Sequence, residues 1–562
     1  MKKTLFLFTL CALSIHILAQ TKTFTVNYNT NNGTYKSFGN VNCGASTSVA
    51  GYTDMGIKEV RTHDYYGPTD YWHYTNGFVN FATSLSGSAT YNSSFNPQLT
   101  SSYTFTAGSD SIITNLINNG FQPYFRLGVS WPASSPPYTP ISPPIDANNT
   151  TFHTFSSICK KTVEHYTAGW NNGFNYTIPY WEVWNEPDGV FWTGNPIKFY
   201  QLYKEVADSI KSFNPNLKVG TCGALVSTII AHNTTYFDNL INYCNVNSVP
   251  LDFYSWHLYG RYNPYSVKNY ADTVRYVLNS KGFVNAESHI TETNSELTSN
   301  SVYDLTAKGS AYVASLLMTC QEASVDKVFW YRGESLGPLA NPDISGVADL
   351  TWNGFGMKSH NTLVAETPTK INSTGNEVIN FNSSVDTTNL MIMAGKNSSG
   401  TQTDILISNL KTNYTNLVVN LNNLPYTAGD VIKIEKYRTQ GPNYKYALTS
   451  SIVTGSSSLV LNVSSATAPC VYLFKIIKLD VTGINELAAE NKIAVYPTIF
   501  VYKISVQNTT GNEQYELSNS LGQKVWAGKE IEQQDFSDLP VGIYFLKIEN
   551  QHSIQTFKLT KQ

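Results

Sequence analysis

The spacing of apolar residues divides the chain into two long parts that meet near residue 361. In the first part, short apolar runs alternate with stripes of helical period, such as Phe199, Leu202, Tyr203 and Val206. Strands that alternate with amphipathic helices indicate an α/β domain with a parallel sheet. Eight runs have the length of buried strands, at residues 38–44, 57–64, 122–128, 178–184, 217–221, 252–257, 288–291 and 327–330. They predict a (β/α)8 TIM barrel over residues 20–360.

After residue 361, apolar and polar positions alternate one by one between turns rich in Asn, Ser and Gly. Such runs lie at residues 390–394, 404–408, 417–421, 431–437, 458–463 and 471–477. This period of two predicts a β-sandwich accessory domain over residues 361–480. Phe24, Val26 and Tyr28 alternate in the same way, so it is open whether residues 21–34 pair with the sandwich or with the barrel. Shorter runs after residues 480–490 predict a small C-terminal β-sandwich over residues 491–562.

The first residues have the pattern of a secretory signal peptide. Lys2 and Lys3 precede an apolar run over residues 5–18, and Ala19 before Gln20 marks a cleavage point. We therefore expect residues 1–19 to be removed during export. No later run approaches the about 20 apolar residues that a membrane-spanning helix needs. The sequence thus predicts an exported protein without a transmembrane segment.

Composition narrows the class of partner. Charged residues make up 14% of the chain, against about 25% in typical soluble proteins. Aromatic residues make up 13% and include 37 Tyr. Such a surface suits an extracellular protein that meets neutral polymers. The formal net charge of −3 gives no basic footprint, so no nucleic-acid partner is expected.

The cysteines are scattered along the chain. One of the seven lies in the signal peptide, and the others are Cys43, Cys159, Cys222, Cys244, Cys320 and Cys470. The sequence has no C-x-x-C pair and no His at metal-ligand spacing, which predicts no zinc site. Two alternatives are open for these six cysteines, namely one or two disulfides or buried free thiols.

Two isolated glutamates end predicted strands. Glu186 lies in W-E-V-W-N-E-P at residues 181–187, and Glu292 lies in H-I-T-E at residues 289–292. Because the carboxyl ends of different strands converge in a (β/α)8 barrel, we expect both side chains in one pocket. A pair of carboxyl groups on either side of a sugar acetal is the usual apparatus of glycoside hydrolysis. The alternative is that both glutamates are solvated or ion-paired surface groups.

Several motifs occur in order between residues 56 and 356. They are G-I-K-E-V-R-T-H at 56–63, G-F-Q-P-Y-F at 120–125, W-E-V-W-N-E-P, N-L-K-V-G at 216–220, V-P-L-D-F-Y-S-W-H-L-Y at 249–259, H-I-T-E-T-N-S at 289–295 and G-F-G at 354–356. Together they resemble glycoside hydrolase family 39, which contains β-xylosidases and α-L-iduronidases. The resemblance implies a retaining enzyme, with Glu186 as acid/base and Glu292 as nucleophile, that uses no metal or organic cofactor.

The same resemblance implies roles for residues around the two glutamates. Asn185 would donate to the sugar 2-hydroxyl, although an Asn at a strand end also suits a cap of the next turn. Arg61 and Tyr259 would keep the nucleophile ionised and oriented.

Three more residues take binding roles from the resemblance. His63 and His257 would line the sugar pocket, where a lone His is otherwise more often a satisfied core residue. Trp330 would stack on a sugar face, with ordinary barrel packing as the alternative.

The chain departs from the family at two positions of the pocket. Arg126 stands where the xylosidases carry an acidic residue on the third strand, and Arg332 follows W-Y at residues 330–331. A guanidinium offers a planar fork for a carboxylate or a sulfate. We therefore expect a plant or algal polysaccharide or oligosaccharide whose sugars carry uronate or sulfate groups. The alternative is that either arginine pairs with a carboxylate of the protein such as Glu334.

The last unit resembles the C-terminal sorting domain of type IX secretion. The resemblance rests on V-Y-P at 495–497, L-S-N-S-L-G-Q-K-V at 517–525 and D-L-P-V-G-I-Y-F-L-K at 538–547, although Thr498 replaces the usual Asn after the first motif. It implies the type IX machinery as a partner and a secreted or cell-surface location. The competing function for the whole chain is a non-catalytic glycan-binding or adhesion protein on a barrel scaffold, which a screen with aryl glycosides would distinguish.

Overall fold

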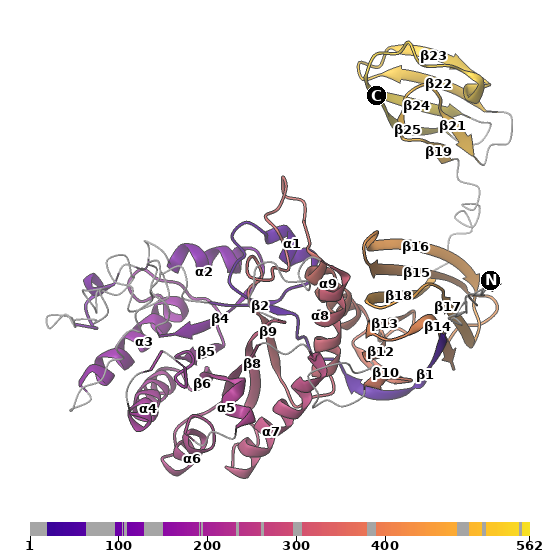
Figure 1. The fold of residues 1–562 in the computed structure, drawn as a ribbon. Helices are drawn as coiled ribbons and strands as arrows, with labels where there is room; N and C mark the ends of the chain where they lie inside the picture. The colour runs from indigo at the N-terminus through magenta and orange to yellow at the C-terminus, as the bar shows by residue number, and fades with distance from the viewer. Residues whose placement is uncertain are drawn as a thin grey trace, which may run out of the picture. The chain divides into compact units, whose positions relative to one another are not determined.

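The computed structural model describes most of the chain. The described residues are 20–62, 96–103, 105, 109–128, 150–189, 191–192, 195–231, 235–259, 263–295, 306–378, 389–479, 494–507, 513–549 and 554–562. The chain divides into two compact units, residues 1–478 and residues 479–562. The first unit contains a barrel and a large curved sheet, and the second is a small β domain (Figure 1).

Eight parallel strands close into a barrel, which confirms the predicted fold class. The strands follow one another around the barrel in chain order. They are β2 (Asn40–Asn42), β3 (Glu59–Arg61), β4 (Gln122–Leu127), β5 (Tyr180–Val183), β6 (Lys218–Leu225), β7 (Phe253–Leu258), β8 (Glu287–Thr293) and β9 (Lys327–Trp330). Hydrogen bonds between β2 and β9 complete the closed sheet.

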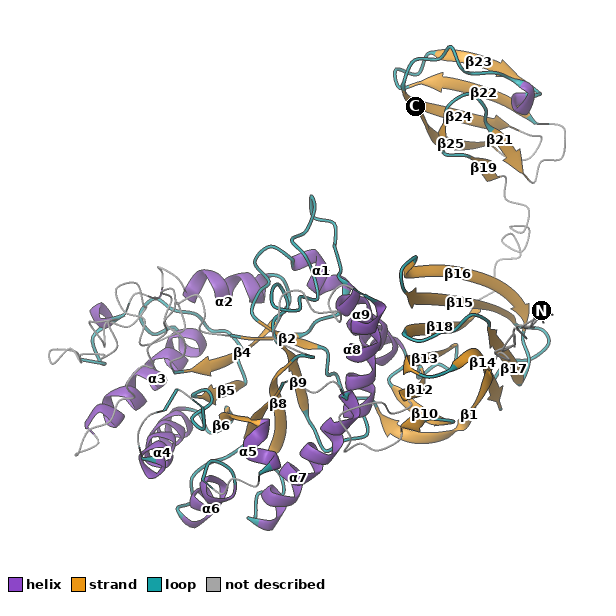
Figure 2. Ribbon diagram, in the orientation of Figure 1, coloured by secondary structure: helices purple, strands orange, loops and turns teal. Residues whose placement is uncertain are grey.

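Helices surround the barrel on the outside, as Figure 2 shows. They are α1 (Val49–Asp54), α2 (Ser109–Asn118), α3 (Thr150–Ala168), α4 (Pro196–Phe213), α5 (Val226–Ile230), α6 (Asp238–Val246), α7 (Val267–Ser280), α8 (Ala307–Cys320) and α9 (Trp352–Glu366). In α4 the apolar stripe noted in the sequence is buried against the barrel. The Asn195 side chain accepts a hydrogen bond from the Ile197 N–H and so caps this helix.

Side chains along each barrel strand point alternately into the barrel and toward the surrounding helices. Tyr124, Phe253 and Phe329 come from strands that are not neighbours, yet their rings pack together. The ring centroids of Tyr124 and Phe329 are 4.8 Å apart, so this contact crosses the inside of the barrel. The adjacent residues Phe125 and Trp330 belong instead to the core between strands and helices. Because successive side chains on a strand point to opposite faces, every second residue beyond these interior aromatics also faces inward.

A curved sheet of ten strands follows the barrel. Its strands are β1 (Gln20–Thr34), β10 (Thr369–Thr374), β11 (Glu377–Val378), β12 (Asn389–Lys396), β13 (Gln402–Lys411), β14 (Tyr414–Asn422), β15 (Val431–Gln440), β16 (Tyr444–Thr454), β17 (Ser458–Val463) and β18 (Cys470–Leu479). Strand β1 pairs with β10 and β14, so residues 20–34 lie in this sheet and not in the barrel. One buried cluster draws side chains from strands at both ends of the sheet, which curls around this core.

The outer face of the curved sheet packs against the barrel helices α8 and α9. On β12, Leu390 and Ile392 join the core of the sheet, whereas Met391 and Met393 join the core of the barrel. The Ser408 hydroxyl donates to the carbonyl oxygen of Ala311 on α8 at 2.9 Å. Both faces of these strands are therefore buried, and the barrel and the sheet form one compact unit.

The second unit has its own core. Its strands are β19 (Ala494–Tyr496), β20 (Ile499–Phe500), β21 (Ser505–Gln507), β22 (Gln514–Asn519), β23 (Lys524–Gly528), β24 (Gly542–Glu549) and β25 (Ile554–Lys561). Leu517, Leu546 and Leu559 are fully buried there, in a cluster that contains no residue of the first unit. Among the described residues of both units, no helix combines the length and apolar character that a membrane span requires.

Four cysteines are buried thiols within the first unit. They are Cys222, Cys244, Cys320 and Cys470. Burial raises the pKa of each of these thiols above its usual value. A thiol that stays protonated in an apolar surrounding is poorly reactive, which favours the buried-thiol alternative for these four residues.

Candidate active site

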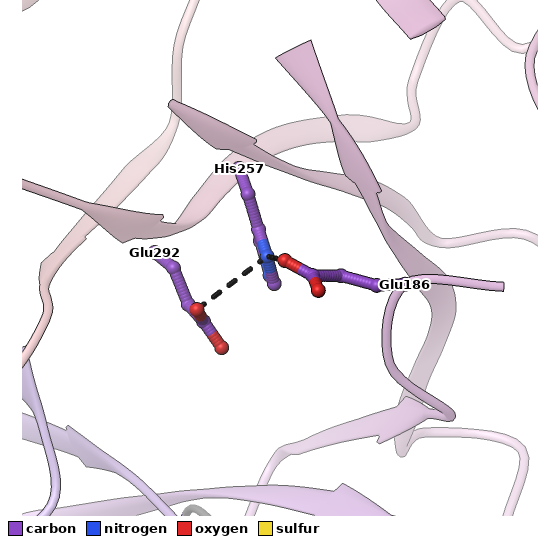
Figure 3. A group of neighbouring side chains, drawn as sticks. All are labelled: Glu186, His257 and Glu292. Atoms are coloured by element: carbon purple, nitrogen blue, oxygen red, sulfur yellow. Dashed lines mark hydrogen bonds and ion pairs between the residues drawn. The ribbon is translucent and has the colours of Figure 1, made fainter. Parts of the chain in front are cut away.

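Glu186 and Glu292 meet at the carboxyl end of the barrel strands, on either side of His257 (Figure 3). Glu186 follows β5, His257 lies on β7 and Glu292 lies on β8. The His257 Nδ1 atom is 2.6 Å from Glu186 Oε1 and 3.5 Å from Glu292 Oε2. One oxygen of each carboxyl group lies within 4.8 Å of the other. The structure thus brings together the two glutamates that the sequence singled out.

The backbone turns sharply where β5 ends. Trp184 has φ of 74° and Glu186 has φ of 40°, in the left-handed region that residues other than glycine seldom adopt. The Trp184 ring packs outside the strands against Trp192, with ring centroids 5.5 Å apart, and its indole N–H donates to the Phe191 carbonyl oxygen. The Glu186 side chain retains 18% exposure, against 5% for Glu292. Glu186 is therefore the more accessible of the two carboxyl groups.

Arg61 of β3 connects the residues around Glu292. Its Nη1 donates to Glu292 Oε1 at 2.7 Å and its Nη2 donates to Asn185 Oδ1 at 3.1 Å. Its Nε donates to Glu182 Oε2 at 2.6 Å. Burial would lower the pKa of Arg61, but the charges of Glu182 and Glu292 outweigh it and raise the pKa. A permanent positive charge therefore lies against Glu292, which favours its ionised form.

Tyr259 completes the surroundings of Glu292. Its hydroxyl donates to Glu292 Oε2 at 2.5 Å. Burial and the neighbouring charge of Glu292 hold the pKa of Tyr259 well above its usual value, so the phenol stays protonated and remains a donor. Each carboxylate oxygen of Glu292 thus accepts a hydrogen bond from a fixed group, which sets the orientation of the side chain.

His257 is held between the glutamates and a glycine. A Cβ atom on Gly223 would lie 2.8 Å from His257 Nε2 and 3.5 Å from Asn185 Oδ1. Gly223 also has φ of 62°, so both space and backbone favour glycine there. No described residue forms a hydrogen bond with the buried His257 Nε2 atom.

Sequence reasoning missed Glu182 and Asn42. Glu182 is fully buried, and it also accepts a hydrogen bond from the Thr291 hydroxyl at 3.0 Å. Asn42 accepts from Arg61 Nη1 at 2.9 Å and donates to the Thr291 carbonyl oxygen at 2.7 Å. A signal for Glu182 existed, because residues 182, 184 and 186 would share one face of a regular strand. Asn42 carries no such signal beyond its place at a strand end.

Trp330 and His63 are the two remaining residues that the sequence predicts in the sugar pocket. The Trp330 ring is 1% exposed, packs edge-on against Tyr312 of α8 and donates from its indole N–H to the Gly337 carbonyl oxygen. This is the packing alternative, with no ring face open to a sugar. His63 lies outside the described residues.

The two arginines that depart from the family have different surroundings. Arg126 lies two residues after Tyr124, faces the barrel interior and is fully buried. Arg332 lines a cavity of about 410 Å³ that Arg61 and Glu334 also line. The carboxyl group of Glu334 accepts hydrogen bonds from the Ser46 N–H at 2.9 Å and from the Ser46 and Ser48 hydroxyls. Glu334 is thus anchored to the loop after β2.

A third carboxyl group lies two residues beyond Glu186. Asp188 accepts hydrogen bonds from the Leu225 N–H at 2.9 Å and from the Thr228 hydroxyl. Burial raises the pKa of Asp188 to about 6, and the charge of Glu186 adds to this effect. Asp188 therefore fixes the start of α5 and titrates close to neutral pH.

Glu186, His257 and Glu292 together also resemble a set of metal ligands, since their donor atoms lie within 4.8 Å of one another. Carboxylates and imidazole are ordinary ligands of divalent cations. However, the guanidinium of Arg61 and the phenol of Tyr259 already occupy both oxygens of Glu292. The positive charge of Arg61 also repels a cation. The arrangement is better suited to a pair of carboxyl groups that act on a neutral acetal.

Models of two known families match parts of the chain. Residues 88–359 match the model of glycosyl hydrolases family 39, and residues 494–562 match the secretion system C-terminal sorting domain. The barrel is therefore similar to family 39 over this stretch, and the end of the chain matches a sorting domain. The sorting domain indicates type IX secretion, to the cell surface or the medium.

Two relatives are β-xylosidases. The one from Geobacillus stearothermophilus is 30% identical over 156 residues, which cover 24% of this chain and 30% of the relative. The one from Caldicellulosiruptor saccharolyticus is 34% identical over 82 residues, which cover 14% of this chain and 15% of the relative. The matches thus span less than a third of the length of either relative.

Solved structures share the fold over a longer stretch. A glucosidase from Croceicoccus marinus superposes with a TM-score of 0.67 at 18% identity, over 82% of this chain and 100% of its own. A monomeric β-xylosidase from Caulobacter crescentus superposes with a TM-score of 0.57 at 15% identity, over 82% of this chain and 100% of its own. At such identities the similarity shows a common fold.

Proposed function

We propose that the barrel, which matches glycosyl hydrolases family 39 over residues 88–359, is an exported retaining glycoside hydrolase similar to the β-xylosidases. The observation that carries the proposal is the approach of Glu186 and Glu292 to within 4.8 Å of each other across His257. Retaining enzymes hold their two carboxyl groups about 5–5.5 Å apart, whereas inverting enzymes leave about 6.5–9.5 Å for a water molecule. The short separation therefore supports a double displacement.

Glu292 is the nucleophile in this mechanism. Arg61 and Tyr259 keep its carboxylate ionised and oriented, so that it attacks the anomeric carbon as the bond to the leaving oxygen breaks. Glu186 is the more exposed carboxyl group and protonates that oxygen. After the leaving group departs, Glu186 takes a proton from water, and the hydroxide releases the sugar from Glu292. The His257 ring has little room to move, because the two glutamates and Gly223 enclose it.

Asn185 supplies a contact to the sugar. Arg61 Nη2 holds the amide oxygen of Asn185, which leaves the Nδ2 group as the donor for a substrate hydroxyl. A donor at the 2-hydroxyl gains strength as positive charge develops in the transition state. The same Arg61 therefore orients both Asn185 and the nucleophile.

The roles of the two glutamates are tested by different substitutions. We expect Glu292→Gly to lose turnover and to recover it with azide, giving a glycosyl azide of inverted configuration. We expect Glu186→Ala to retain activity on aryl glycosides with good leaving groups far better than on natural glycans, because such groups need little proton assistance. Aryl glycosides and product analysis by NMR measure both effects.

Two controls test whether a loss of activity comes from misfolding or from the loss of a bound metal. Glu292→Gln and Glu186→Gln conserve shape, and their melting temperatures should stay near that of the wild type. Wild-type activity should survive dialysis against EDTA. Near-normal turnover of natural glycans by either glutamate variant, or loss of activity with EDTA, contradicts the assignment.

We further propose that the substrate is a plant or algal polysaccharide or oligosaccharide with uronate or sulfate groups. The cavity that both Arg332 and Arg61 line supports an anionic group there, because two guanidinium groups border the same space. A charge-assisted hydrogen bond contributes about 1.5–3 kcal/mol. We expect Arg332→Ala to lose activity on uronate-bearing or sulfated oligosaccharides by about 10–100-fold, with less effect on neutral xylo-oligosaccharides.

Arg126→Ala serves as the comparison, because Arg126 is fully buried inside the barrel. Its replacement should lower stability and affect both kinds of substrate alike. If the wild type prefers neutral substrates and both variants keep that preference, the arginines are structural. A non-catalytic glycan-binding role remains the competing function, and turnover of any aryl glycoside that depends on Glu292 argues against it.

A further inference from the structure

A second cleft lies between the barrel and the curved sheet, lined by neither catalytic glutamate. It has a volume of about 600 Å³ and is lined by Thr306, Ala307, Lys308, Trp352, Gln440, Gly441, Pro442, Thr467, Ala468 and Pro469. The first four belong to the cap of α8 and to the first turns of α8 and α9. In a (β/α)8 barrel each helix begins at the carboxyl end of the strand before it. The cleft therefore lies at the same end of the barrel as Glu186 and Glu292.

The lining of this cleft combines flat apolar surfaces with polar groups. Trp352 is half-buried at the start of α9 and lines the cleft. Pro442 and Pro469 add apolar surface from the sheet, and Thr306 and Thr467 add hydroxyls. Sugar rings present an apolar face of C–H groups and a rim of hydroxyls, which suits an aromatic platform with polar neighbours.

The wall of the cleft on the side of the sheet is held in place before any ligand binds. The Gln440 amide donates to the carbonyl oxygens of Ser465 at 3.1 Å and Thr467 at 2.8 Å. Its oxygen accepts from Arg438 Nε at 2.8 Å and from the Tyr472 hydroxyl at 3.3 Å. These bonds join the end of β15 to the loop before β18. A preformed wall lowers the cost of ordering on binding.

We propose that this cleft binds a segment of the polysaccharide beyond the sugars that the glutamates process, with Trp352 as the stacking platform. The proposal rests on the proposed function for its choice of a glycan. A cleft made jointly by the barrel and the sheet also gives the sheet a role in holding the polymer against the catalytic end. The volume falls within the range of about 300–1,000 Å³ that is usual for ligand sites.

The test is affinity gel electrophoresis of the full mature chain in gels that contain soluble xylan, mixed-linkage β-glucan, pectate or alginate. Glu292→Gln in every sample prevents hydrolysis. We expect the parent to be retarded by at least one polysaccharide and Trp352→Ala to weaken that retardation about tenfold in apparent affinity. Trp352→Phe retains a ring and should keep most of the binding, which separates stacking from a general loss of folding.

Controls keep this inference distinct from the proposed function. Tyr276 on α7 is 72% exposed, and Tyr276→Ala should leave retardation unchanged. With Glu292 restored, Trp352→Ala should hydrolyse aryl glycosides within about twofold of the wild type, since the cleft excludes the glutamates. If Trp352→Ala binds every polysaccharide like its parent, or if the parent binds none, the cleft is no glycan site. If Trp352→Ala loses retardation and the protein with Glu292 restored hydrolyses no glycoside, the glycan-binding cleft is supported and the proposed hydrolase activity is refuted.

Discussion

At the scale of single residues, Glu182 explains how Arg61 can lie beside Glu292, the proposed nucleophile, inside a closed barrel. An isolated buried guanidinium would carry a large desolvation cost. Glu182 and Glu292 share that charge at 2.6 Å and 2.7 Å from different atoms of the guanidinium. Glu182 is fully buried and forms an ion pair with Arg61, so its effect on Glu292 would come through the position and charge of Arg61.

The prediction at this scale concerns the charge of Glu182. Glu182→Gln preserves the shape and leaves Arg61 with Glu292 as its counter-charge. We expect the carboxylate of Glu292 to become too stable, so that the acid limb of the pH profile of kcat/KM moves to lower pH and kcat falls about tenfold, or about 1.4 kcal/mol. A pH–rate series with an aryl glycoside measures both changes.

Glu287 offers a matched control for Glu182. It lies at the other end of the barrel, where it accepts hydrogen bonds from the Tyr180 hydroxyl at 3.0 Å and is also joined to His289 at 2.8 Å. Glu287→Gln should reduce stability without moving the acid limb. An unchanged limb and an unchanged kcat in Glu182→Gln would remove Glu182 from the mechanism.

At the scale of elements, β13 contains a carboxyl group whose burial opposes folding. Asp404 is fully buried, and its Oδ1 atom accepts from Gln402 Nε2 at 3.0 Å. No described residue forms a hydrogen bond with its Oδ2 atom. Burial raises the pKa of Asp404 to about 8, and the nearby charge of Glu366 adds to this effect. The strand therefore carries a carboxyl group that is protonated at neutral pH.

This raised pKa predicts how stability depends on pH. Between about pH 4 and pH 8 the folded protein holds a proton on Asp404 that the unfolded chain has released, so stability falls as pH rises through this window. Asp404→Asn imitates the protonated form, so its stability should not fall in this way as the pH rises. We expect it to raise the melting temperature of the first unit at pH 9 and to change it little at pH 4, at about 1.4 kcal/mol per pKa unit.

Asp430 provides a control of opposite sign. Hydrogen bonds from Lys478 and Thr427 lower the pKa of this carboxyl group, so its ionisation favours folding. Asp430→Asn should therefore cost a little stability at pH 9. If Asp404→Asn has a lower melting temperature than the wild type at pH 9, the ionised Asp404 stabilises the folded protein. That result contradicts a raised pKa of Asp404.

At the scale of the whole molecule, the two units have separate cores. The buried cluster of residues 495–559 contains no residue of the barrel or the curved sheet. Removing residues 491–562 should leave the first unit folded, because none of its buried contacts are lost. The sheet, in contrast, shares a core with α8 and α9 through residues such as Met391 and Leu406.

The prediction at this scale concerns export. A chain without residues 491–562 should keep its activity on aryl glycosides and its melting temperature, yet accumulate in the periplasm of a host with type IX secretion. Cell fractionation and activity assays measure this. As a control, residues 491–562 fused to a periplasmic reporter should carry it to the surface. Normal surface levels of the truncated chain would exclude a sorting role.

The period of apolar positions predicted most helices and strands, but it missed several strands whose side chains are mostly polar. The barrel strands occur where the sequence indicated, because a buried parallel strand leaves a short continuous apolar run. Strand β16 (Tyr444–Thr454) was missed, since most of its side chains are exposed and leave no apolar signal. Strand β25 (Ile554–Lys561) was missed as well. In its sequence I-Q-T-F-K-L-T-K, apolar and polar residues do not alternate regularly.

By itself the sequence determined the barrel, the order of its strands and the two glutamates at strand ends, because period and spacing are local properties of the chain. Only the tertiary structure decided which side chains meet across the barrel. Arg61, Glu182 and Glu292 come from β3, β5 and β8, and their ion pairs depend on how a closed sheet is staggered. The same holds for Trp330, which faces α8 and not the pocket. Alternation along a strand sets two faces, and only barrel closure decides what each face meets.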